Sequence, residues 1–79
     1  MTVKEFVGLC ADRNMEVIIT DRIGRKIANG SAMEVFTNEM EVITDNMAFI
    51  DKQMTREELL KSKVGCFYCN NNKLRITLE

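Results

Sequence analysis

The clearest hydrophobic pattern lies at the C-terminal end of the chain, where Leu74, Ile76 and Leu78 alternate with polar residues. Strict alternation is typical of a strand with one buried face. The apolar stretch 64–69 predicts the partner strand, and the consecutive asparagines between the two strands suit a tight turn, because asparagine tolerates the left-handed backbone conformation. We therefore expect a β-hairpin over residues 64–78.

A second hairpin is predicted in the first half of the chain. Residues 15–20 are rich in β-branched side chains and alternate in hydrophobicity, and residues 25–29 can return beside them. Asp21 and Gly24 lie between these strands, and glycine suits the positive φ of such a turn. Ahead of this hairpin, the apolar residues of 3–11 recur at helical spacing, which predicts a short helix.

Three segments share the form S/T-x-x-E followed by two apolar residues, and they begin at Thr2, Ser31 and Thr55. This form is typical of a helix start, where the hydroxyl and the carboxylate satisfy backbone N–H groups. The stretches MEVIITD and MEVITD, at 15–21 and 40–45, also resemble each other. Three helix–hairpin units are therefore expected, over 2–30, 31–54 and 55–79. Chance similarity among common residues is the alternative.

A different interpretation of the middle of the chain remains open. Met33, Met40, Met47 and Met54 fall seven residues apart, and apolar residues stand three positions after the first three of them. Such an a/d heptad is typical of one long helix, here over 31–61, that pairs with a second copy. The β-rich residues 42–44 disfavour this helix.

The composition fits one small globular domain over residues 1–79. The chain is 46% hydrophobic and 29% charged, which argues against disorder. We expect an α+β fold in which short helices pack on one face of an antiparallel sheet built from hairpins. The C-terminal hairpin is expected to be central in that sheet.

Charge is unevenly distributed, although its sum is only −1. Residues 31–60 carry seven acidic and two basic side chains, whereas residues 61–79 carry one acidic and four basic ones. No overall basic field therefore attracts nucleic acid. Charged residues interrupt the N-terminal apolar run, and no apolar stretch approaches the roughly 20 residues that span a bilayer. We expect a cytoplasmic protein with reduced thiols and no membrane partner.

Catalytic chemistry is not expected. The chain has no histidine, the usual general base, and no recognisable nucleophile or phosphate-binding glycine motif. Cys66 and Cys69 form a C-x-x-C, but within a predicted strand their thiols point to opposite faces. A zinc site would need a carboxylate or a second subunit to complete it. We therefore expect no catalytic, cofactor-binding or metal-binding residues and no cofactor.

Protein contact is the leading functional hypothesis. Methionine adapts to irregular contact surfaces, and the acidic middle segment would complement a basic partner. The candidate protein-binding residues are Glu34, Glu39, Met40, Glu41, Asp45, Met47 and Asp51. Core packing is the alternative role for the methionines.

Two other functions are considered. Basic side chains near strand aromatics can bind single-stranded nucleic acid. The candidate nucleic-acid-binding residues are Arg22, Arg25, Lys26, Lys73 and Arg75. Self-assembly through sheet edges or the methionine heptads is the third hypothesis, and it includes a homodimer.

The two ends of the chain carry a resemblance. MTVKEFVGLC at the start and EELLKSKVGCFYCNNNKLRITLE at the end, within 1–36 and 57–79, resemble small uncharacterised proteins of bacteriophages and prophages in Firmicutes. Residues 37–56 depart from that pattern, and no site residues transfer. The resemblance implies a short helix, a hairpin and a terminal hairpin. It also implies an accessory phage function, such as inhibition of a host defence protein in the manner of an anti-CRISPR protein.

Overall fold

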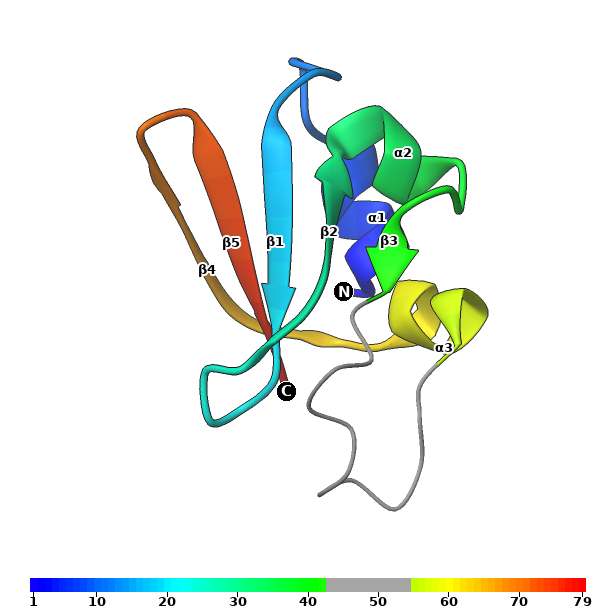
Figure 1. Ribbon diagram of the computed structural model, residues 1–79, viewed down its shortest axis with the longest axis vertical. Helices are drawn as coiled ribbons and strands as arrows, with labels where there is room; N and C mark the ends of the chain where they lie inside the picture. Colours follow the sequence, from blue (N-terminus) through cyan, green and yellow to red (C-terminus); the bar gives the residue numbers. More distant parts are fainter. Residues whose placement is uncertain (43–54) are drawn as a thin grey trace.

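The computed structural model describes residues 1–42 and 55–79, and it has the expected α+β class. The helices are α1 (Val3–Gly8), α2 (Ala32–Phe36) and α3 (Arg56–Lys61). The strands are β1 (Glu16–Thr20), β2 (Lys26–Ser31), β3 (Glu41–Val42), β4 (Val64–Asn70) and β5 (Lys73–Leu78). The three helices lie together beside the sheet, while the hairpin of β4 and β5 extends away from them (Figure 1).

Each helix starts where the sequence indicates, with a complete capping box. The hydroxyl oxygens of Thr2, Ser31 and Thr55 accept a hydrogen bond from the backbone N–H three residues later. In return, the glutamate at that position accepts from the backbone N–H of the capping residue. The helices are only five or six residues long, and α1 ends before the predicted residue 11. Short helices such as these depend on their caps and on packing.

The sheet has the strand order β3-β2-β1-β5-β4, and it is mixed rather than wholly antiparallel. Both predicted hairpins form, with β1 antiparallel to β2 and β4 antiparallel to β5. However, β1 and β5 run parallel to each other. The prediction of an antiparallel sheet was therefore wrong at this junction, because the two hairpins meet side by side with these strands in the same direction. The C-terminal hairpin is central only through β5, since β4 lies at the edge.

The hydrophobic core lies between the helices and one face of the sheet. Val17 and Ile19 of β1 and the alternate apolar residues of β5 belong to it, together with Val7 of α1 and Leu59 of α3. The remaining residues of these strands point to the other face, which no described helix covers. We refer to it as the open face. Thr20 lies on it and is buried, and its hydroxyl lies 3.1 Å from that of Thr77.

The two interpretations of the middle segment can be compared only where the structure describes it. A continuous helix over 31–61 is wrong, because α2 ends at Phe36, Asn38 has a φ of 67°, and strand β3 follows. The second hairpin of the proposed repeat falls largely on residues 43–54, outside the described residues. The structure does not show the internal repeat.

Candidate protein-binding edge

The two edge strands of the sheet differ in charge. The described residues of β3, Glu41 and Val42, include one charged side chain. β4 spans seven residues, VGCFYCN, without a charge or a proline. An edge strand presents unpaired backbone groups to other chains, and proteins usually block such an edge with short strands, charges, proline or bulges. Glu41 places such a charge on β3, whereas β4 has neither a charge nor a proline.

The turn of the C-terminal hairpin determines which backbone groups β4 presents. Asn71 and Asn72 have φ values of 52° and 61°, as in a two-residue type I′ turn, and Asn70 pairs with Lys73. Residues flanking such a turn exchange both backbone hydrogen bonds, and bonded and non-bonded pairs then alternate along the hairpin. Tyr68 therefore bonds to β5, whereas the N–H and C=O groups of Phe67 and Cys69 point outward.

The beginning of this edge is already occupied. The N–H of Val64 donates to the carbonyl of Met1 at 2.9 Å, and Thr2 forms an isolated antiparallel bridge with Lys63. Gly65 then interrupts the register, and a Cβ there would lie 3.1–3.2 Å from backbone atoms of Leu78 and Glu79. The free part of the edge therefore follows Gly65.

Exposed apolar side chains gather around this free edge. Leu9 and Phe67 are 72% and 55% exposed, and Met1 is also exposed. These three line a surface groove between α1 and β4, together with Phe6, Val64, Gly65 and Cys66. Tyr68 is exposed on the open face of the same strand. Larger exposed apolar patches mark protein contact sites, and we take these residues as the candidate contact surface.

One aromatic contact joins α1 to the helical face of β4. The rings of Phe6 and Phe67 pack with their centroids 4.5 Å apart. One turn beyond Phe6, Cys10 is partly buried, and burial raises the pKa of its thiol, with smaller contributions from Cys69 and Asp12. A neutral Cys10 thiol suits its place against the hydrophobic core.

The two cysteines of the C-x-x-C lie on opposite faces, as predicted. Cys66 stands opposite Thr77 on the open face, and Cys69 stands opposite Leu74 on the helical face. Both are free thiols. Over residues 1–42 and 55–79, no three potential metal-binding side chains gather in one place.

Four of the predicted protein-binding residues, Glu34, Glu39, Met40 and Glu41, lie in the described part of the chain. Met40 is wrong as a contact residue, because its side chain is fully buried and packs close to Gly30. The carboxylate of Glu34 accepts from the Ser31 N–H at the cap of α2. Glu39 and Glu41 are exposed. Asp45, Met47 and Asp51 lie outside the described residues.

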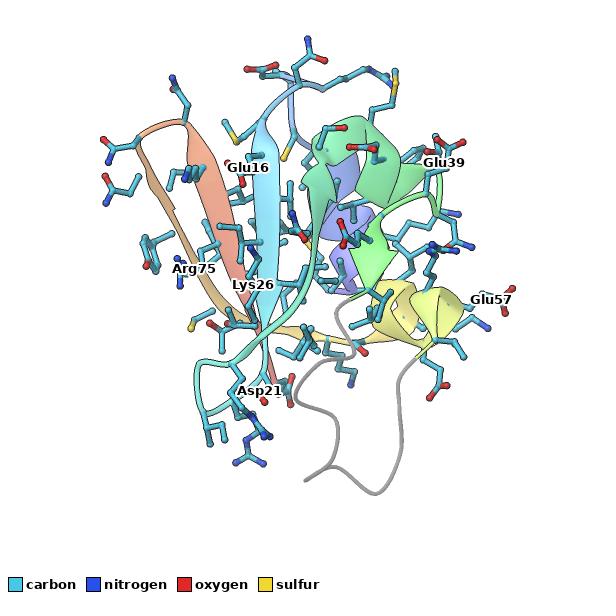
Figure 2. All side chains as sticks on the ribbon, in the orientation of Figure 1. Glu16, Asp21, Lys26, Glu39, Glu57 and Arg75 are labelled. Carbon is cyan, nitrogen blue, oxygen red and sulfur yellow. The ribbon has the colours of Figure 1, made fainter. Side chains whose placement is uncertain are left out.

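The predicted basic residues fall into two groups. Lys26, Lys73 and Arg75 lie on the open face, where the Arg75 guanidinium lies 6.0 Å from the ring centroid of Tyr68. Figure 2 shows Lys26 and Arg75 over the sheet, whereas Glu39 and Glu57 lie at the right of the view, beside α2 and α3. The ammonium group of Lys73 lies 3.7 Å from the Glu16 carboxylate.

Arg22 and Arg25 lie at the turn between β1 and β2 instead. Arg25 forms an ion pair of 2.9 Å with Asp21, and Arg22 is exposed. Burial raises the pKa of the Asp21 carboxyl, but hydrogen bonds from Arg25 and Ile23 and the Arg25 charge outweigh burial and lower it below its ordinary value. Arg25 therefore stabilises the turn through its ion pair with Asp21. The five basic residues do not form one patch.

The outward backbone groups of β4 were missed by sequence reasoning. The uncharged run VGCFYCN was the available signal, but a hairpin sequence does not reveal which of its strands will lie at the edge.

No helix in the part of the chain that the structure describes has the length and apolar character to cross a membrane. Comparisons of the chain with protein-family models, curated proteins and solved structures found no match.

Proposed function

We propose that this protein is a small non-enzymatic binding protein that acts through protein–protein contact, with β4 as its contact strand. The observation that carries the proposal is the unprotected edge at Phe67 and Cys69, beside exposed apolar side chains. An extended segment of a target protein would add to the sheet there. Its backbone would bond to the outward groups, and its apolar side chains would enter the groove beside α1.

The target belongs to a bacterial host in this proposal. The resemblance of the chain ends to small phage and prophage proteins supports that context, and a host defence protein is the target that the context favours. Strand addition would occlude or distort such a protein without any chemical step. Glu39 and Glu41, both exposed, would add attraction for a basic target at a separate surface.

A tagged pull-down from a Firmicute lysate, with nuclease present, tests this function. We expect the wild type to retain a host protein that Cys69→Pro loses, because proline removes an outward N–H. Ile23→Lys is the matched control, since Ile23 is 74% exposed on the other hairpin. Equal recovery by all three proteins would refute β4 as the contact strand for the target.

Charge reversal tests the acidic contribution separately. Glu39→Lys combined with Glu41→Lys should weaken capture of the same host protein, and the loss should shrink as salt rises. Unchanged capture would remove these glutamates from the contact surface while leaving β4 in place.

Single-stranded nucleic acid is a second candidate ligand, because the open face carries Tyr68 with the Arg75 guanidinium 6.0 Å from its ring centroid, and also carries Lys26. Exposed aromatic rings beside cations can stack bases and neutralise phosphates. Binding of a labelled oligonucleotide should then fall steeply as salt rises and should weaken in Arg75→Ala. No binding at roughly 50 mM salt would eliminate this candidate.

A further inference from the structure

We propose that a second copy of this chain covers the β4 edge in the free protein. The two β4 strands would pair antiparallel about a twofold axis at Tyr68, and a target strand would have to displace the second copy. This inference rests on the proposed function, because it gives the same edge a partner before the target is met.

The composition of β4 favours a copy of itself. The strand has no charge, so antiparallel self-pairing places no like charges opposite one another. Nothing on the strand selects a partner by the sign of its charge. A twofold contact joins one surface to itself, and it therefore requires a self-complementary surface of this kind.

The faces of the sheet restrict the register. A twofold axis perpendicular to the sheet keeps the open face of both copies on the same side, so each residue must stand opposite one on its own face. Tyr68 can therefore stand opposite Tyr68 of the other copy, with Phe67 opposite Cys69. In this register the outward groups of Phe67 and Cys69 meet as hydrogen-bonded pairs.

The start of β4, where the N-terminal residues bind, favours an axis at Tyr68 over an axis at Phe67. Centring the axis on Phe67 would place Cys69 opposite Gly65, where the strand is irregular. It would also place Asn70 of the other copy opposite Val64, whose N–H is already bonded to the Met1 carbonyl, and the asparagine turn would extend beyond that point. Centring the axis on Tyr68 pairs residues 66–70 and stops short of both obstacles.

The pairing also accounts for the exposed apolar side chains. In the described part of the chain, seven large hydrophobic residues are exposed, and Met1, Leu9, Phe67 and Tyr68 lie on β4 or in the adjoining groove. In the dimer, Phe67 and Leu9 would lie along the junction on the helical face. The two Tyr68 rings would lie next to each other on the open face.

Sedimentation equilibrium tests the dimer, from about 1 µM to about 1 mM protein, the range that separates tight from weak self-association. The mass should rise from 9.1 kDa towards twice that value for the wild type and for Ile23→Lys. Cys69→Pro and Phe67→Lys should remain monomeric at every concentration. A monomeric wild type would overturn the dimer, and β4-dependent capture of a host protein would still support the proposed function.

Cross-linking tests the register. In a background with all three cysteines replaced by serine, Tyr68→Cys should form an intermolecular disulfide with oxidised glutathione, which is reduced to two thiols in the exchange. Asn70→Cys lies on the same face, but in this register it is four residues from its counterpart, so it should cross-link far more slowly. Equal rates for the two variants, or faster cross-linking through Asn70→Cys, would overturn the Tyr68-centred pairing.

Discussion

Phe6 of α1 and Phe67 of β4 pack with their ring centroids 4.5 Å apart and their planes inclined by 55°. This contact joins the first helix to the edge strand across 61 positions of the chain. It holds the helical side of β4 in place while the outward backbone groups of the strand remain free. The contact strand is therefore supported from within the fold before any partner arrives.

The aromatic pair should show a measurable coupling. Phe6→Ala and Phe67→Ala should each lower the free energy of unfolding, and the double variant should lose less than the two single losses combined. Tilted aromatic pairs contribute about 0.5–1.5 kcal/mol beyond their buried area. Denaturant unfolding of the four proteins, in dilute solution to limit self-association, measures this difference. Strictly additive losses would show that the rings do not stabilise each other.

Proline should act differently at adjacent positions of β4. Cys69→Pro removes an N–H that points outward, so the fold should persist with little loss of stability. Tyr68→Pro removes an N–H that bonds to β5 and should cost about 1–3 kcal/mol more, the typical range for leaving a buried partner unsatisfied. Thermal unfolding of both variants provides the comparison, with Tyr68→Ala as the side-chain control. The opposite order would mean that the outward groups are assigned to the wrong residues.

The capping boxes should contribute strongly because the helices are short. Ser31→Ala removes the oxygen that accepts from the Glu34 N–H at 3.1 Å. Loss of such a cap typically costs about 1 kcal/mol. Chemical denaturation should show this loss, and Ser31→Asp should restore most of it because aspartate also caps helices. A stability unchanged by Ser31→Ala would contradict a stabilising role for the box.

Asp21 should make stability depend on pH. The pKa of the Asp21 carboxyl is lower in the folded protein than in the unfolded chain, where an aspartate has a pKa of about 3.9. The carboxylate therefore stabilises the fold above the unfolded pKa, and this stabilisation is lost as pH falls through the folded pKa. Asp21→Asn should therefore have a lower melting temperature than the wild type at neutral pH. The difference between the two melting temperatures should disappear as the solution is acidified below about pH 4. Melting curves at several pH values measure the gap. A gap independent of pH would contradict the contribution of the ionised carboxylate.

Local features of the fold could be predicted from the sequence. The hairpin strands and the three helix starts depend on neighbouring residues, such as Thr2 with Glu5 or Asn71 with Asn72, and the structure confirms them. The parallel pairing of β1 with β5 could not be predicted, because Val17 and Leu74 meet across the whole length of the fold. Nothing in either hairpin specifies that neighbour.

Met40 shows why the acidic surface was only partly predictable. Methionine fits both a core and a contact surface, and the heptad spacing favoured neither. The residue is buried where β3 follows α2, and its Cα and Cβ would lie 3.4 Å from a Cβ added at Gly30. Conversely, the sequence of β4 predicts a hairpin strand but not its place in the sheet, and only the strand order shows that it lies at the edge.

Amide hydrogen exchange across a dilution series tests the contact strand most directly. The N–H groups of Phe67 and Cys69 should exchange slowly at high protein concentration, where a second copy covers them, and should exchange faster on dilution. The Tyr68 N–H should stay protected throughout, because it bonds to β5. Free exchange at Phe67 and Cys69 at every concentration, and equally with a captured host protein present, would contradict the assignment of β4 as the contact strand.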